Sequence, residues 1–159
     1  MRKGLLVLLF VVIGTGAVSA NSLDLGLSYD YYMMSVDIRP DLSPISAVME
    51  AGRTFGHTDP NQGKSFTVVG LGYEYASITP WIGWARISGG GKNGVAFGVN
   101  SEIWMERIGF SATLALMSHN LHTVGRVKYK WDLATAHVGF VYNSHIGKSK
   151  IMAGLGIHY

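Results

Sequence analysis

Residues 151–159, Ile-Met-Ala-Gly-Leu-Gly-Ile-His-Tyr, decide the fold expected for this chain. Apolar and aromatic residues occupy every second position, and small or polar residues lie between them. Successive side chains of a β-strand point to opposite faces, so one face of this segment is apolar and the other is not. The apolar face carries Ile151, Ala153, Leu155, Ile157 and Tyr159, opposite Met152, Gly154, Gly156 and His158. The segment predicts a strand between two different environments.

The same alternation recurs along the chain. Residues 23–31 place Leu23, Leu25, Leu27, Tyr29 and Tyr31 opposite Asp24, Gly26, Ser28 and Asp30. Further alternating segments cover 46–55, 65–76, 94–105, 107–117 and 133–142, and 78–87 is a strand whose faces stay open. With 151–159 these make eight segments of roughly ten residues, the length with which a tilted strand crosses a bilayer. Turn signals separate most of them, so we expect one all-β domain over residues 21–159.

One stretch does not fit eight strands. Residues 123–133 also alternate, with Arg126, Lys128, Lys130 and Asp132 on one side, and the phase changes at Leu133-Ala134. A bulge in a long seventh strand, with its polar part standing clear of the membrane, is one interpretation. A separate short strand is the other.

The start of the chain has the features of a secretory signal. Arg2 and Lys3 precede an uncharged stretch rich in leucine and valine, and Val18-Ser19-Ala20 offers small residues to a signal peptidase. We expect residues 1–20 to be a signal peptide that is cleaved before Asn21. An uncleaved anchor is the alternative, but its apolar core is shorter than the roughly 20 residues of a spanning helix.

Composition narrows the class of protein. Charged residues make up 14% of the chain, well below the roughly 25% usual in soluble domains. Loss of Arg2 and Lys3 would leave 11 of the 13 basic residues against 10 acidic ones, so no basic surface for nucleic acid is expected. With no cysteine, neither a disulfide scaffold nor a thiolate zinc site is possible.

Three features favour an apolar face that points outward to lipid. The opposite face is rich in Gly, Ser and Thr, which suits a narrow lumen better than a solvent-exposed surface. Tyr and Trp lie near segment ends, as in interfacial girdles. The chain also ends on an aromatic residue in phase with the apolar face. The ring residues are Tyr29, Tyr31, Tyr73, Tyr75, Trp81, Trp104, Trp131, Tyr142 and Tyr159.

The alternation that ends at Tyr159 resembles the last strand of bacterial outer-membrane proteins. The resemblance implies that Tyr159 is a signal for the barrel-assembly machinery, although Phe is the commoner ending. The length after residue 20 is similar to that of the OmpX and OmpA transmembrane barrels. It implies a closed antiparallel transmembrane β-barrel of eight strands in the outer membrane, with membrane lipid and the assembly machinery as partners. No family-specific motif is present.

Loop lengths fit this arrangement imperfectly. With both termini in the periplasm, residues 34–45 form a long outer loop, as outer-membrane barrels prefer. The connection 56–64 is then a long periplasmic one, and the turns near Ala76-Ser77 and Met105-Glu106 are short outer ones. Either the strand register differs from the one assigned here, or the barrel departs from the common pattern of loop lengths.

The charges opposite the apolar faces are candidates for a polar network in the lumen. Buried charges must pair, and such a network would fill the barrel. The candidates are Asp24, Asp30, Glu50, Glu74, Glu102, Arg107 and His137, joined by Arg86 if its register allows.

Other reactive residues carry little chemistry. Ser118, His119 and His122 suggest a lipid A deacylase only faintly, because neighbouring strand residues point to opposite faces and a nucleophile needs its base within reach. The six histidines show no compact ligand spacing beyond His119-x-x-His122, and Gly89-Gly90-Gly91 lacks the context of a phosphate loop. We expect no cofactor and no metal. The function expected is structural or surface interaction rather than catalysis, with an unknown surface ligand. A lipid-modifying enzyme, a lipocalin-like carrier of an apolar ligand and a narrow channel are the alternatives.

Overall fold

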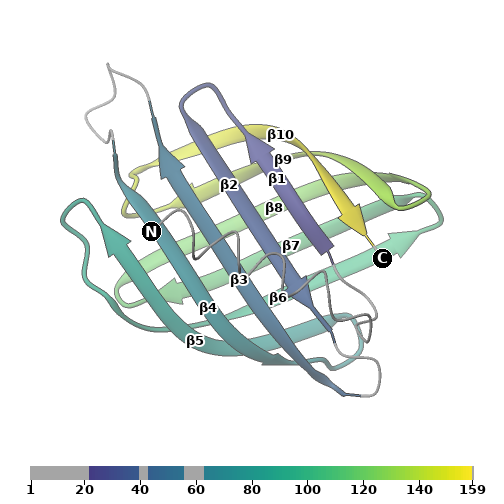
Figure 1. Cartoon of the computed structure of the whole chain (residues 1–159), viewed down its shortest axis with the longest axis horizontal. Coiled ribbons are helices and arrows are strands. Elements are labelled where there is room, and N and C mark those ends of the chain that lie inside the picture. The colour runs from purple at the N-terminus through teal and green to yellow at the C-terminus, as the bar shows by residue number, and fades with distance from the viewer. Residues whose placement is uncertain (1–21, 40–42, 56–62, 159) are drawn as a thin grey trace, which may run out of the picture.

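The computed structural model describes residues 22–39, 43–55 and 63–158. The expected signal peptide with its cleavage site, and Tyr159, lie outside these residues. The described chain forms one closed antiparallel barrel in which β1 pairs with β10 (Figure 1). Its strands are β1 (Ser22–Leu27), β2 (Tyr31–Ile38), β3 (Ile45–Thr54), β4 (Ser65–Tyr73), β5 (Ile78–Ser88), β6 (Gly94–Met105), β7 (Ile108–Met117), β8 (Asn120–Trp131), β9 (Ala134–Asn143) and β10 (Lys148–His158).

The barrel therefore has ten strands within the described residues, and the expectation of eight is wrong. One added strand arises because residues 23–31 are not a single strand. The chain turns at residues 28–30, where Ser28 N–H donates to the Tyr31 carbonyl at 2.7 Å. Tyr31 then begins β2 and points inward with 0% exposure, whereas Leu27 before the turn points outward. Because the alternation of apolar and polar residues continues through the turn, it does not reveal that the inward and outward positions are exchanged after it.

The second added strand is β8, so the separate strand, not the bulge, is the correct interpretation of residues 123–133. Asp132 and Leu133 form a two-residue turn between β8 and β9, with Asp132 at φ 53°. The phase change at Leu133-Ala134 marks this reversal. Ala76, Glu106 and Ser118 begin similar short turns with φ near 55–59°.

Ten strands also correct the placement of the loops. The connections 39–44, 74–77, 106–107 and 132–133 lie at the barrel end that carries Ser22 and His158, which we call the terminal end. The connections 28–30, 55–64, 89–93, 118–119 and 144–147 lie at the opposite end, the loop end. The connection within 34–45 was expected opposite the termini but is on their side, and the connection 56–64 was expected on the side of the termini but joins strands at the opposite end. The long connection between Thr54 and Ser65 is then on the side opposite the termini, but the six-residue connection between Ile38 and Ile45 is on the side of the termini.

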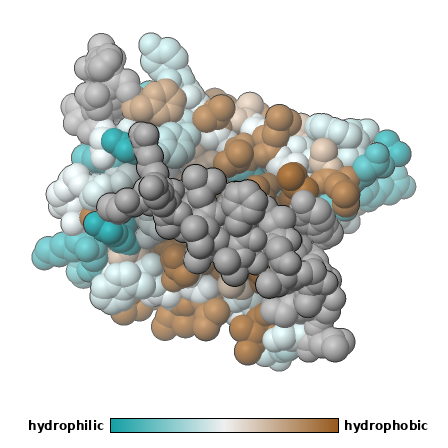
Figure 2. Space-filling model, viewed as in Figure 1, coloured by the Kyte–Doolittle hydropathy of each residue, from teal (hydrophilic) through white to brown (hydrophobic). Residues whose placement is uncertain are grey.

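The faces of the strands follow the sequence pattern closely. Strand residues that point outward are almost all apolar, and Figure 2 shows hydrophobic side chains over the visible strands and hydrophilic ones gathered at the two ends. Leu155, Leu71 and Ile82 are each 63% exposed, and Leu114 is 56% exposed. This orientation is opposite to that of a lipocalin, whose apolar faces point inward. No helix among the described residues has the length and apolar character needed to span a bilayer.

The interior is wider than an eight-stranded lumen, because barrel diameter grows with strand number. Larger side chains than expected fill it. Tyr31, Phe66, Met33, Met117 and Met152 are all at most 1% exposed. Trp81, expected in an interfacial girdle, is also inside, and an added Cβ at Gly98 would lie 2.6 Å from its ring. The interior glycines thus leave room for rings.

Candidate functional site in the barrel interior

The interior has two chemically different halves. Toward the loop end, mainly apolar side chains fill the space together with the buried His122 and Asn143, and Ile146 from the turn between β9 and β10 caps them with 1% exposure. Two contacts tie the loop end together: Lys64 Nζ donates to the His145 carbonyl at 3.0 Å, and His145 Nε2 lies 2.7 Å from the Ser88 carbonyl. Toward the terminal end, charged and hydroxyl side chains surround a cavity of about 50 Å³. That volume holds a few water molecules.

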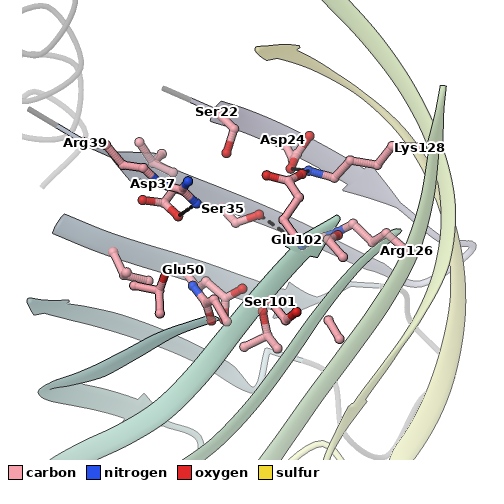
Figure 3. A pocket seen from close by; sticks show the side chains of 17 residues that line it. Ser22, Asp24, Ser35, Asp37, Arg39, Glu50, Ser101, Glu102, Arg126 and Lys128 are labelled. Carbon is pink, nitrogen blue, oxygen red and sulfur yellow. Dashed lines mark hydrogen bonds and ion pairs between the residues drawn. The ribbon is translucent and has the colours of Figure 1, made fainter. Parts of the chain in front are cut away.

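Lys128 is the centre of the polar half. Its side chain, from β8, is 4% exposed, and Nζ lies 2.7 Å from Asp24 Oδ2 and 2.9 Å from Glu102 Oε1 (Figure 3). Asp24 is on β1 and Glu102 is on β6, so one ammonium links three strands. His137 Nδ1 also lies 3.8 Å from Asp24 Oδ1. This cluster joins a lysine to two carboxylates in a site with little solvent.

A second contact crosses the full width of the barrel. Glu50 on β3 and His122 on β8 face one another from opposite walls, with Oε2 and Nε2 3.2 Å apart and side chains 3% and 0% exposed. The other ring nitrogen of His122 lies 3.3 Å from Asn143 Nδ2. Arg126 makes a similar link to β2, where its Nη2 donates to Ser35 Oγ at 2.9 Å. These contacts brace the walls against one another.

Arg39 closes the network at the rim of the terminal end. Its guanidinium forms ion pairs with Asp37 at 3.1 Å and with Glu74 at 3.0 Å. Burial disfavours its charged form, but the hydrogen bond to Asp37 and the nearby carboxylates outweigh that effect and raise the pKa of Arg39. At the opposite rim, Lys150 pairs with Asp30.

Most of the residues expected in the lumen lie in this network, and two do not. Asp24, Glu50, Glu102 and His137 are inside, and Asp30 and Glu74 are at the rims. Arg86 points outward from β5, and Arg107 lies in the exposed turn between β6 and β7, so their assignment to the lumen is wrong. The register of residues 78–87 explains the first error: Trp81, Ala85 and Ile87 are buried, which puts Arg86 on the outer face.

The basic partners of the network were missed. Arg126, Lys128 and Lys150 are each at most 9% exposed, and His122 is fully buried. These basic residues could have been predicted from the alternation of Arg126 and Lys128 with Val127 and Tyr129. It predicts inward-pointing cations once residues 120–131 are accepted as a strand of the wall.

Neither a hydrolytic site nor a metal site is assembled in the part of the chain that the structure describes. Ser118 and His119 occupy the turn between β7 and β8, and His119 is exposed. His122 points into the barrel toward Glu50, away from that turn, so the three residues form no catalytic group. No group of three or more His, Asp or Glu side chains is placed to hold a metal among the described residues.

Comparisons with known proteins give one weak structural similarity. No family model matches the chain, and no curated protein matches its sequence. Among solved structures, the chain is similar to the crystal structure of Neisserial surface protein A, with 12% identity over 88% of this chain and 94% of that one. The TM-score is 0.37, so the assignment of the fold rests on the strand pairing of this chain itself.

Proposed function

We propose that this protein is a bacterial outer-membrane β-barrel with a sealed interior, which acts as a structural or surface-interaction protein through its loop end. The single observation that carries the proposal is the outward face of the barrel. It is covered by exposed large apolar side chains on every strand, such as Leu25, Leu71, Leu114 and Leu155. A soluble protein rarely exposes so continuous an apolar surface, whereas a membrane barrel requires it.

Two further features support a membrane location. Every strand is paired on both sides, so no open sheet edge would face lipid. Aromatic rings also project outward near the terminal end, where Tyr73, Tyr75, Tyr129 and Trp131 are 43–75% exposed. Such rings favour the boundary between lipid and water.

The loop lengths support a definite orientation. Outer-membrane barrels keep short turns on the periplasmic side and longer loops outside. Two of the four connections at the terminal end are the two-residue turns Glu106-Arg107 and Asp132-Leu133, and the longest connection, between Thr54 and Ser65, joins strands at the loop end. We infer that the terminal end faces the periplasm. Export by the signal peptide of residues 1–20 and assembly through Tyr159 belong to the same proposal.

The other functions find less support. A channel would need a continuous passage, but apolar side chains and Ile146 fill the loop half of the described interior. A lipocalin-like carrier would hold its ligand inside the barrel, and the cavity between Lys128 and Asp24 in the interior is only about 50 Å³ and lined mainly by polar and charged side chains. A lipid-modifying enzyme would need a nucleophile beside its base, and Ser118 has no such neighbour among the described residues.

Membrane fractionation of the full chain expressed in a Gram-negative host tests the proposal. The protein should separate with outer-membrane fractions and should migrate faster on gels when unheated than when boiled. Leu155→Arg, with an arginine on the outward face, should decrease the fraction of protein in the fast-migrating form. Recovery of the wild-type protein in the soluble periplasmic fraction, with no change of migration on heating, would refute a membrane barrel.

A further inference from the structure

Two arginines interrupt the apolar outer face of the barrel. Among the strand residues whose side chains the structure describes, Arg53 and Arg86 are the only charged ones that point outward. Arg53 lies at the end of β3, where Gly52 and Thr54 on either side are buried, and Arg86 lies between the buried Ala85 and Ile87. The two are therefore directed outward by the strand pleat itself, and not by a loop.

Both arginines lie at the loop end, on the two strands that flank β4. Arg53 on β3 is opposite Ser65 on β4, and Arg86 on β5 is opposite Thr67 on β4. They are thus two strands apart, about 10 Å across the sheet. Three hydroxyl side chains fill the outer face around them, and Ser65 and Ser88 are hydrogen-bonded to one another. We call this group the arginine patch: Arg53, Ser65, Thr67, Arg86 and Ser88.

The arginines are exposed and lack internal partners. Neither forms a hydrogen bond or ion pair with another described residue. Immediately below them on the same outer face, Val69 is 53% and Trp84 is 58% exposed, so the patch borders the apolar belt. A long side chain at such a border extends its guanidinium toward the lipid headgroups while its stem stays in the apolar layer.

We propose that the arginine patch binds the headgroup phosphate of an anionic lipid in the leaflet next to the loop end. The inference rests on the proposed function, and it adds a specific lipid-binding site to it. A guanidinium forms paired hydrogen bonds with phosphate oxygens, and the serine and threonine hydroxyls can donate to the same group. Among the strand residues whose side chains are described, no charged one points outward at the opposite rim, where Tyr73, Tyr129 and Trp131 do.

The chain carries its own reporters for a test. Of its four tryptophans, Trp84 and Trp131 point outward, at the patch and at the opposite rim, while Trp81 is buried inside. Trp104, half-buried beside His158 at the terminal end, is replaced by Phe in both reporter proteins. In Trp131→Phe protein, quenching by brominated lipid reports on lipid beside the patch. In Trp84→Phe protein, it reports on lipid at the terminal rim. Quenching by brominated phosphatidic acid relative to brominated phosphatidylcholine, in mixed vesicles, gives the local preference for phosphate.

Phosphatidic acid should be preferred at Trp84 and not at Trp131. Each of Arg53→Gln and Arg86→Gln should reduce the preference at Trp84 roughly fivefold, the usual effect of one basic residue at a lipid surface. The double lysine variant R53K/R86K keeps the charge and should retain more preference than R53Q/R86Q. Arg107→Gln, in an exposed turn of the other end, is the matched control and should change nothing.

Several results would overturn the site. These are an equal preference at Trp84 and Trp131, no effect of R53Q/R86Q, or an equal loss in the lysine and glutamine variants, which would show that positive charge at these two positions does not attract the lipid. Loss of the preference on addition of millimolar inorganic phosphate would show a site for a soluble anion in place of a lipid. No quenching at either tryptophan would refute the membrane barrel, and the lipid site with it.

Discussion

Replacement of Lys128 by methionine should destabilise the barrel strongly, because its ammonium neutralises two buried carboxylates. The side chains of Lys128, Asp24 and Glu102 are 4%, 5% and 14% exposed, and both Nζ–oxygen distances are below 3 Å. Removal of one partner of a buried ion pair costs about 3–5 kcal/mol, chiefly because the remaining charge is left unpaired. Water in the adjacent cavity of about 50 Å³ can solvate the carboxylates in part. We therefore expect a loss near the lower value, about 3 kcal/mol.

Urea titration of the protein in lipid vesicles measures this loss. The folded fraction can be followed by the difference in gel migration between unheated folded and unfolded protein. Lys130→Met is the matched control, since Lys130 is on the same strand and forms no ion pair among the described residues. The triple variant D24N/E102Q/K128M should recover most of the lost free energy of unfolding. Equal effects of K128M and K130M, or a triple variant as unstable as the single one, would refute the argument.

Three other changes should have distinct effects. Leu155→Arg, at an outward position that is 63% exposed, should lower the free energy of unfolding by about 2–4 kcal/mol in the same titration. Gly154→Arg should instead destabilise the barrel by crowding the interior. If a cysteine at 155 is labelled from water and a cysteine at 154 is not, both expectations are wrong. Ala76→Gly should raise stability by about 1 kcal/mol, because Ala76 has φ 55°, and an unchanged unfolding midpoint would count against strain at that turn. Deletion of Tyr159 should reduce protease-resistant, inserted protein far more than Gly90→Ser, and normal insertion without it would remove the proposed assembly signal.

The sequence was sufficient for the barrel class and for the outward face of most strands, but not for Tyr31 or for residues 78–87. The alternation of 151–159 predicted a last strand that pairs with the first, and the register Leu23↔Ile157 confirms it. Strand number was not accessible in the same way, because a tight turn need not interrupt alternation. Between Leu27 and Tyr31, the pattern continues through the turn while the direction of the chain reverses.

The acidic half of the interior network was easier to predict than the basic half. Asp24, Glu50 and Glu102 are single charges among glycines and small residues, so their faces were clear. Arg126 and Lys128 lie in a stretch whose charges could equally well belong to a polar extension outside the membrane. Only the pairing of β8 with β7 and β9 places them in the wall. Pairing partners distant in sequence cannot be deduced from one strand's own pattern.

The two halves of the interior make the barrel packed at the loop end and hollow at the terminal end. Ile146 and the packed rings beside it fill the loop end, and the charged cluster around Lys128 lines the cavity of the terminal end. Among the described residues, water in this cavity therefore contacts Lys128, Asp24 and Glu102 from the terminal end, and the packed side chains around Ile146 separate the cavity from the loop end.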